Sequence, residues 1–370
     1  MQSNIPFADA HESVGLDPGM DPARANAAAP QWSVVVIARN EEATIANCLE
    51  SVLQAFSARS YELIFVDSAS TDRTVSAAAR FPAKIIRIPP SNRLSPSLGR
   101  HTGSLYARGE WILFLDGDCT LNPHWVGEAE RVLMEHPDLG GIAGERVQVL
   151  AATRPHPSAC YNYPYPDTDY VAADFLSGSA LYTRKALLAS GGFNPFLRSC
   201  EEAELGARLR KSGFRLLRLR SAMSWHAIKH ANETTSELLR RVRRGFFVGS
   251  GQFVRYCYLQ DLPVTQPFAA IRRYVQFFGL LVLGLIAAVG SILAHTAVLL
   301  VAWLSLMIAI FLAFVVRNRG VRKPAYYFLE WTLTAPLVVW GFLQTPRVDW
   351  ERVHGFTADG NPPKLSLIHI

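Results

Sequence analysis

The chain has 370 residues, of which 49% are hydrophobic and 18% are charged, and its mean hydropathy is +0.12. The hydrophobic share and the hydropathy are high for a purely soluble protein, so membrane segments are expected. A formal net charge of +6 suits an anionic partner such as lipid or nucleotide phosphate. Nucleic acid is a poor fit, because the basic residues gather at the edges of apolar runs rather than on an aromatic-studded face.

The five cysteines are scattered without a Cys-x-x-Cys pair, which fits neither a zinc site nor a disulfide framework. We expect reduced thiols in a cytosolic domain. Residues 1–31 are rich in Ala, Asp and Pro and lack the apolar core of a signal peptide. They are expected to form a disordered leader.

Short β-branched or apolar runs alternate with helical patterns from residue 32 onward. Strands are predicted at 33–38, 62–66, 84–88 and 111–115, and the first is followed by a helix with a 3.6-residue apolar stripe. Ser70 is a candidate N-cap for the helix after the second strand. This alternation predicts an α/β fold, a mostly parallel sheet flanked by helices. Ligands of such sheets bind beyond the carboxyl ends of the strands, where Asp67 and Asp116 follow their strands.

Residues 274–293 and 297–316 are apolar and each long enough to span a hydrocarbon core. Arginines precede and follow the pair, while the short link between them has no Lys or Arg. The positive-inside rule therefore predicts a hairpin with both ends in the cytoplasm. A third apolar stretch, 325–343, holds Glu330 and Pro336 and is expected either to span or to lie at the interface.

The basic segment before these spans contains four arginines next to bulky apolar residues. This composition is typical of helices that lie on an anionic membrane surface, so residues 231–272 are predicted to be interfacial helices. The helix around 234–251 could also close over a bound diphosphate. Residues 345–370 are expected to form a C-terminal tail.

The sharpest local feature is Asp116-Gly117-Asp118, directly after the fourth predicted strand. Two carboxylates on a tight turn can share one hard cation, which can also take diphosphate oxygens. Gly117 permits the bend. An ordinary surface turn is the alternative, because Asp-x-Asp alone is common.

An ordered set of motifs gives that turn its context. The segments of this set are Ser33-Val-Val-Val-Ile-Ala-Arg-Asn-Glu-Glu, Phe65-Val-Asp-Ser-Ala-Ser-Thr-Asp-Arg-Thr74, Leu98-Gly-Arg-His-Thr-Gly103, Phe114-Leu-Asp-Gly-Asp118, Gly191-Gly-Phe193, Cys200-Glu-Glu-Ala-Glu-Leu-Gly-Ala-Arg-Leu209 and Ser224-Trp-His226. In these segments, over roughly residues 32–226, the chain resembles the family 2 glycosyltransferases, which have the GT-A nucleotide-sugar-binding fold. The resemblance implies a GT-A catalytic domain over residues 32–230.

The resemblance also implies a nucleotide-sugar site, with a UDP-sugar as the default donor. The residues expected there are Ala38, Asn40, Glu41, Asp67, Arg100, Asp116 and Gly117. Asp67 can accept hydrogen bonds from the base or the ribose, and Arg100 is expected near the phosphates, with a solvated surface arginine as the alternative. The family often has a second acid after this Asp, where this chain has Ser68.

The implied cofactor is Mn²⁺ or Mg²⁺. Asp118 is the implied direct ligand, whereas Asp116 reaches the ribose or, through water, the cation. His226 resembles a histidine that some relatives add to the metal shell, and imidazole suits Mn²⁺ better than Mg²⁺.

Glu201 and Glu202 open a predicted helix where the family pattern is Glu-Asp. The resemblance assigns the general base to the second acid, Glu202, and Glu201 remains an alternative. Compensation of the helix dipole would also place acids there.

Together these features predict an inverting, metal-dependent glycosyltransferase of the inner (plasma) membrane, multi-pass, with its catalytic domain in the cytoplasm. The C-terminal spans resemble the membrane-bound branch that builds exopolysaccharides or decorates lipid-linked sugars, so the acceptor is expected to be lipid-linked or near membrane lipid. A processive synthase is a competing hypothesis, although residues 234–251 contain neither Gln nor Trp of the Gln-x-x-Arg-Trp motif of such enzymes.

Two further hypotheses fit less well. A nucleotidyltransferase would need a glycine-rich loop after the first strand, and residues 38–44 contain no glycine. A non-catalytic membrane scaffold is disfavoured because Asp116, Asp118 and Glu202 are all intact.

Overall fold

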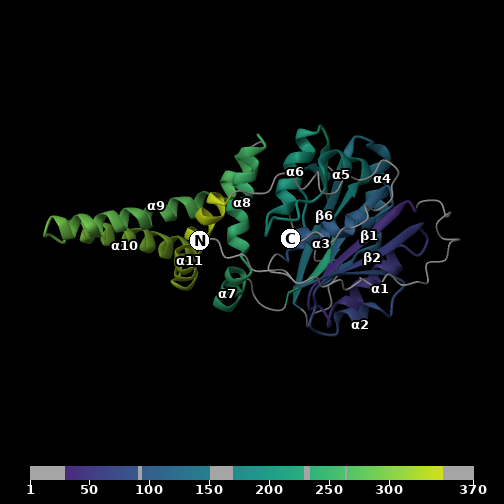
Figure 1. Cartoon of the computed structure of the whole chain (residues 1–370), viewed down its shortest axis with the longest axis horizontal. Helices are drawn as coiled ribbons and strands as arrows, with labels where there is room; N and C mark the ends of the chain where they lie inside the picture. The colour runs from purple at the N-terminus through teal and green to yellow at the C-terminus, as the bar shows by residue number, and fades with distance from the viewer. Residues whose placement is uncertain (1–29, 91–93, 151–169, 229–233, 263–264, 345–370) are drawn as a thin grey trace, which may run out of the picture.

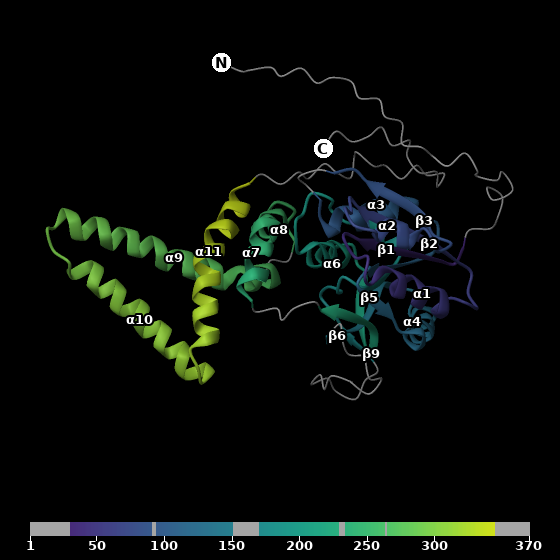
Figure 2. The same cartoon turned by 90° about the horizontal axis from the view of Figure 1, so that it is seen from below.

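The computed structural model describes residues 30–90, 94–150, 170–228, 234–262 and 265–344 (Figure 1). The predicted tail, and the predicted leader except for its last two residues, lie outside the described residues. An α/β body, called the catalytic body below, is joined through α7 (Thr235–Arg243) and α8 (Phe246–Leu259) to a helical projection (Figure 2). The projection is formed by α9 (Thr265–Leu293), α10 (Val298–Asn318) and α11 (Arg322–Leu343).

The strands of the described residues join into one nine-stranded sheet in the order β3-β2-β1-β4-β8-β6-β9-β5, with β7 paired to β9. The four strands predicted from sequence form one half of it. The strands are β1 (Trp32–Ala38), β2 (Tyr61–Ser68), β3 (Lys84–Ile88), β4 (Trp111–Asp116), β5 (Cys119–Leu121), β6 (Leu139–Leu150), β7 (Tyr170–Ala172), β8 (Ala180–Thr183) and β9 (Arg215–Ile228).

The predicted parallel pairing is confirmed for the first half of the sheet, and the second half is mixed. Strands β3, β2, β1 and β4 are parallel neighbours, but β8 is antiparallel to both β4 and β6. Strand β9 is parallel to β6 and antiparallel to β5 and β7. The sheet is therefore mixed.

The central strand β1 is buried along its whole length, as expected for a strand covered by helices on both faces. The helices of this body are α1 (Ile45–Ala55), α2 (Thr74–Ala78), α3 (Pro96–Tyr106), α4 (Pro123–Glu135), α5 (Arg184–Ser190) and α6 (Glu201–Lys211). Helix α3 packs closely on the sheet, because a Cβ at Gly103 would overlap Val35. Ser70 is not the N-cap of α2, which begins at Thr74 after Arg73.

The basic segment forms two helices, α7 (Thr235–Arg243) and α8 (Phe246–Leu259), separated by Gly245 with φ 70°. A positive φ is strained for other residues, so the glycine lets the chain turn there. Helix α8 then packs into a second hydrophobic cluster that includes Ala207 of α6 and Val338.

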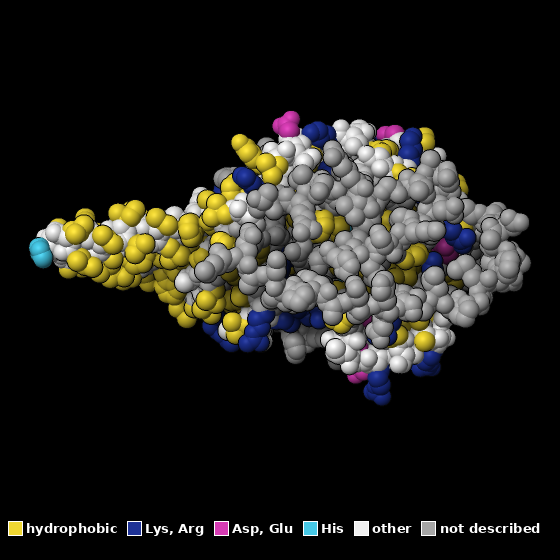
Figure 3. Space-filling model, viewed as in Figure 1, with side chains coloured by type: hydrophobic (Ala, Val, Ile, Leu, Met, Phe, Trp, Pro, Cys, Tyr) yellow, Lys and Arg dark blue, Asp and Glu magenta, His cyan; other side chains and the backbone are white. Residues whose placement is uncertain are grey.

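Helices α9 (Thr265–Leu293) and α10 (Val298–Asn318) form the apolar projection, and α11 (Arg322–Leu343) returns toward the body (Figures 1 and 2). Among the described residues, Ile271–Leu293 and Val298–Asn318 are long and apolar enough to cross a membrane. Hydrophobic side chains cover the visible surface of the projection (Figure 3). The third predicted stretch became α11, whose later residues pack on α8.

Candidate active site

The carboxyl ends of β1, β2 and β4 lie side by side, as the sequence predicted. In the strand register Ala38 pairs with Asp67, and Ile37 pairs with Asp116. The Gly117 amide donates to the Ile37 carbonyl at 2.9 Å, and a Cβ at Gly117 would lie 2.7 Å from the Ala38 Cβ. Only glycine therefore lets the Asp-Gly-Asp turn fold back against β1.

The loops that follow β1 and β2 are tied to each other. Asn40 adopts φ 59°, its side-chain oxygen accepts from the Thr71 amide at 2.8 Å, and its amide donates to Ser70 Oγ at 2.9 Å. The Glu41 amide donates to Thr74 Oγ1 at 2.8 Å. Asn40 and Glu41 thus stand beside the end of β2 in a preformed loop.

Asp67 is fully buried at the end of β2. Its carboxylate accepts from the Ser70 amide at 3.2 and 3.3 Å, and Arg87 Nε lies 3.8 Å away. These contacts fix the carboxylate at the sheet edge, where it faces the loop that holds Asn40.

Arg100 projects from α3 and joins three carboxylates. Its Nη2 donates to Asp116 at 2.7 Å, and its Nη1 donates to Glu201 at 2.7 Å and lies 3.6 Å from Glu202. The side chain is only 3% exposed. The alternative of a solvated surface arginine is wrong, because the guanidinium is buried against the protein's own acids. The expected place of Arg100 near the phosphates stays a prediction.

The two glutamates at the start of α6 have different surroundings. Cys200, with φ 64°, precedes the helix and turns both acids toward Arg100. The Glu201 side chain is 5% exposed, whereas that of Glu202 is 23% exposed. Burial, with the neighbouring charge of Glu202, raises the pKa of Glu201 to about 8 although Arg100 opposes the shift. Glu202 is therefore the more accessible of the two acids.

Asp118 is paired with His226, which reaches it from β9. His226 Nε2 lies 3.0 Å from Asp118 Oδ2, because β9 pairs with β5 and places His226 opposite Cys119. Burial alone would raise the pKa of Asp118, but the hydrogen bond and charge of His226 outweigh it and lower the pKa. Asp118 is thus held as a carboxylate.

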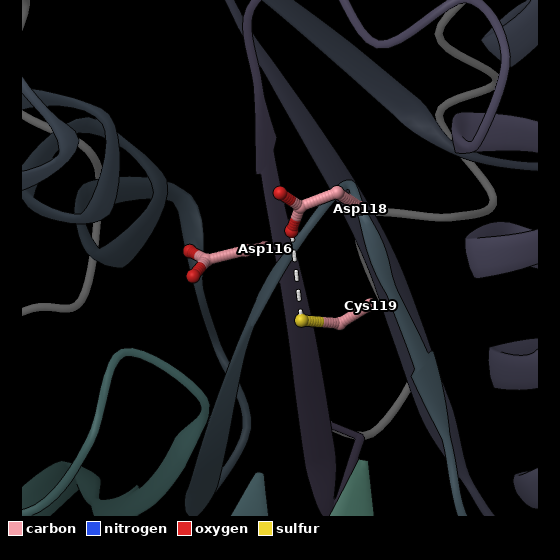
Figure 4. Close-up of side chains that lie close together, drawn as sticks. All are labelled: Asp116, Asp118 and Cys119. Carbon is pink, nitrogen blue, oxygen red and sulfur yellow. Dashed lines mark hydrogen bonds between the residues drawn. The ribbon is translucent and has the colours of Figure 1, made fainter. Parts of the chain in front are cut away.

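The side chains of Asp116, Asp118 and Cys119 point to the same side of the turn (Figure 4). Their ligand atoms lie within 4.8 Å of one another, close enough to share a cation. Burial raises the pKa of the Cys119 thiol well above its usual value, so this sulfur stays protonated and suits a hard cation poorly. The carboxylate oxygens of Asp116 and Asp118 are donors that suit a hard divalent cation, and His226 Nε2 lies beside Asp118.

Comparison with known proteins agrees with this geometry. The profile of Glycosyl transferase family 2 matches residues 33–190. The chain carries a family 2 glycosyltransferase domain. This match includes the Asp-Gly-Asp turn and the strands that carry Ala38, Asp67 and Asp116.

Two curated relatives of this glycosyltransferase domain are the succinoglycan biosynthesis protein ExoO of Rhizobium meliloti (strain 1021) and the putative glycosyltransferase EpsE of Bacillus subtilis (strain 168). ExoO is 33% identical over 125 residues, 33% of this chain and 34% of its own length. EpsE is 28% identical over 214 residues, 52% of this chain and 72% of its own length. The alignment therefore spans only about a third of ExoO.

The mannosyltransferase PcManGT of Pyrobaculum calidifontis, solved with GDP-Man and Mn²⁺, has the same fold. Its TM-score is 0.55 at 20% identity, and the match covers 85% of this chain and 88% of that chain. The GT-A fold predicted from the sequence is confirmed.

Two residues of the glycosyltransferase site gave no recognisable signal in the sequence. Gly178 lies just before β8, where an added Cβ would be 2.7 Å from Arg100 Nη2 and 3.0 Å from Asp116 Oδ2. Arg146, on β6, lies 3.4 Å from the same carboxylate. Both reach the site through the pairing of distant strands, which no local motif records.

Proposed function

We propose that this protein is an inverting, metal-dependent glycosyltransferase that moves a sugar from a nucleoside diphosphate donor, by default UDP, to an acceptor at the membrane. One observation carries the proposal: acids from the donor-binding strands and from α6 meet at one site. Asp116 at the end of β4 and Glu202 at the start of α6 both face the Arg100 guanidinium. The site thus combines donor binding with a group that can accept a proton.

The donor would lie along the edge formed by β1, β2 and β4. Asp67, Asn40 and Glu41 would contact the nucleoside, since hydroxyl and ring N–H groups donate to carboxylate and amide oxygens. Asp118, with Asp116 and His226, would hold the cation. A bound divalent cation would neutralise the charge that develops on the departing diphosphate. The solved neighbour with GDP-Man and Mn²⁺ shares the fold and supports this arrangement.

Glu202 would act as the general base. It is the more exposed of the two glutamates at the start of α6 and stands 3.6 Å from Arg100 Nη1. It would take the proton of the acceptor hydroxyl as that oxygen attacks the sugar, and in-line attack inverts the anomeric carbon. Glu201, buried and 2.7 Å from Arg100, would hold the guanidinium that orients Asp116 and Glu202.

The acceptor would be lipid-linked or near the membrane surface of the inner membrane, with the catalytic domain in the cytoplasm. The two candidate spans and the arginines at their ends support this placement. The name of ExoO, a succinoglycan biosynthesis protein, favours synthesis of a cell-surface polysaccharide or glycolipid.

A processive synthase remains the second candidate because of helix α8. Residues 234–251 lack Gln, but the helix continues with Gln252 and Arg255 at the spacing of the processive motif and with Tyr256 in place of Trp. Helix α8 therefore carries most of the processive motif, just after residues 234–251. In the structure Gln252 bonds Gln344 at 2.7 Å, and Arg255 lies over the ring of Phe342.

A donor screen tests the proposal. The purified full chain is incubated with common nucleotide sugars with and without Mn²⁺ or Mg²⁺, and released nucleoside diphosphate is measured. We expect metal-dependent turnover with at least one donor. Glu202→Gln and Asp118→Ala should each lower turnover at least about 10²-fold.

Asp138→Ala is the matched control, because Asp138 pairs with Arg215 at the surface and away from the sheet edge. Absence of metal-dependent turnover across the donors would contradict the proposal. Release of pyrophosphate would point to the nucleotidyltransferase instead, and near-normal turnover by Glu202→Gln would move the base to Glu201.

A further inference from the structure

Helix α8 contacts the residues directly before α6, the helix that begins with Glu201 and Glu202. Ser199 Oγ donates to the Phe246 carbonyl at 2.7 Å, and Cys200 Sγ lies 3.7 Å from Ser250 Oγ. Ser199 is buried, and Cys200 holds a left-handed backbone conformation. The residues immediately before the proposed base are therefore fixed by contacts with α8.

A glycine sets the distance between α8 and this segment. A Cβ at Gly249 would lie 2.5 Å from the Ser199 nitrogen and 3.0 Å from the Arg198 carbonyl carbon. Carbon atoms do not approach backbone atoms so closely, so any side chain at this position would push α8 and the start of α6 apart.

The opposite side of α8 is held just as closely by α11. A Cβ at Gly251 would lie 2.6 Å from the Phe342 nitrogen, and one at Gly341 would lie 2.9 Å from the Val248 carbonyl carbon. Val338 of α11 and Ala207 of α6 belong to the same buried cluster as the inner residues of α8. Both cartoon views place α8 between the catalytic body and the projecting helices (Figures 1 and 2).

We propose that Ser199 and Gly249 are positioning residues for the general base, and that α11 acts on the base through α8. The inference rests on the proposed function, in which Glu202 accepts the proton. Arg100 and Asp116 lie on α3 and β4, whereas the position of Glu202 depends on Ser199 and Cys200, which contact α8. Because close-packed atoms transmit displacements to their neighbours, a shift of α8 moves Glu202 relative to Asp116.

The test compares Gly249→Ala and Gly341→Ala with Gly279→Ala in the full chain. At Gly279, on α9, an added Cβ meets no atom of the described residues within 4 Å. We expect kcat to fall at least about tenfold in the first two variants, because displacement near 1 Å costs up to about 10²-fold. The donor KM should stay unchanged, because the donor contacts lie on β1, β2 and β4. The control should behave as the wild type.

Ser199→Ala keeps the test decisive if the glycine variants fail to fold, because it removes one hydroxyl and adds no bulk. Loss of that hydrogen bond should lower kcat about twofold to tenfold without raising the donor KM. Wild-type kcat in Ser199→Ala and in folded Gly249→Ala would overturn the inference, as would a change in donor KM alone. An inactive wild-type chain would instead contradict the proposed function, and this inference with it.

Discussion

Glu201 and Glu202 are adjacent in sequence, yet burial gives them different chemistry. Burial and the charge of Glu202 raise the pKa of Glu201 from its ordinary 4.5 to about 8. Between these two values the folded chain holds a proton that the unfolded chain has released. The stability that Glu201 contributes is therefore fully present below about pH 4.5 and is lost as the pH rises toward 8.

Glu201→Gln cannot titrate and should remove this dependence. We expect the difference in Tm, wild type minus Glu201→Gln, to fall steadily from pH 5 to pH 8 and to level off above it, because folding then buries a charge. Thermal unfolding of both proteins in the same detergent across this range measures it. A difference that is constant with pH would show that the Glu201 pKa is not raised by folding.

Gly178 provides space for the group of charges around Arg100. A methyl group there would press on Arg100 Nη2 and Asp116 Oδ2 and would lie 3.3 Å from Glu202 Oε1. Gly178→Ala should therefore lower kcat at least about tenfold, because a displacement of about 1 Å in a catalytic group can lower the rate about 10²-fold.

Gly127→Ala in α4 is the matched control, since among the described residues its added Cβ would meet only the far end of Arg59, at 3.5 Å. Alanine also favours helices, so this variant should keep its activity and its Tm. Equal activity of Gly178→Ala and the wild type in the nucleoside diphosphate assay would contradict the proposed geometry.

The sequence predicted which acids lie at the site, but it did not predict how deeply their partners are buried. Asp67 and Asp116 were found because strand ends in a parallel sheet share an edge, and the register Ala38–Asp67 and Ile37–Asp116 confirms the shared edge. The burial of Arg100 was not predictable, because its partners stand 16 and about 100 residues away. Their roles in catalysis stay predictions.

Among elements, those defined by local patterns were predicted well. The third strand has the predicted bounds, 84–88, and α6 begins at Glu201 as expected. The antiparallel strand β8 was not foreseen, because pairing between distant strands has no local period. Ser70, expected to cap a helix, instead accepts from the Asn40 amide. Polar residues near helix starts can serve a neighbouring loop equally well.

Helix α6 depends on a buried ion pair that ties it to α5. Arg208 donates to Glu204 at 2.5 and 2.7 Å, and also to the carbonyls of Ser190 and Gly192 at the end of α5. Arg208→Met should lower the free energy of unfolding by about 3–5 kcal/mol, because it leaves a carboxylate buried without its guanidinium. Urea unfolding of the solubilised chain measures this loss.

Two further variants distinguish the burial of a charge from the loss of packing. Arg208→Met with Glu204→Leu should be more stable than Arg208→Met alone, because an apolar pair needs no solvation. Arg210→Met, on the same helix but 30% exposed and paired with Asp174, should cost about 1 kcal/mol or less. Equal losses for Arg208→Met and Arg210→Met would rule out the buried-charge explanation.

At the scale of the whole molecule, the projection differs from the catalytic body because its exposed surface is apolar. Helix α10 has no buried residue within its candidate span, although Met307 and Phe314 pack against the cluster around Trp331. Helices α9 and α10 contact each other closely at Gly284, where an added Cβ would lie 2.5 Å from the Trp303 ring. This surface makes sense if the bilayer supplies the surroundings of the hairpin.

The length and flanking charges of the hairpin predict its orientation. Spans of 23 and 21 residues rise about 1.5 Å per residue, which matches a hydrocarbon core of about 30 Å. Arg272 and Arg273 lie at the start of the first span, Arg317 lies at the end of the second and Arg319 directly follows it, whereas the turn at His295 has no Lys or Arg. The turn should therefore cross to the far side, while both ends stay with the catalytic domain.

Labelling with a membrane-impermeant thiol reagent tests this orientation in sealed vesicles. Cysteine introduced at His295, in the exposed turn, should react only from the side opposite the catalytic domain. Cysteine introduced at Gly320, where an added Cβ meets no atom of the described residues within 4 Å, should react only from the catalytic side. The signal of the wild-type chain is subtracted, since it has its own thiols. Labelling of both positions from one side would show that α9 and α10 lie on the bilayer rather than crossing it.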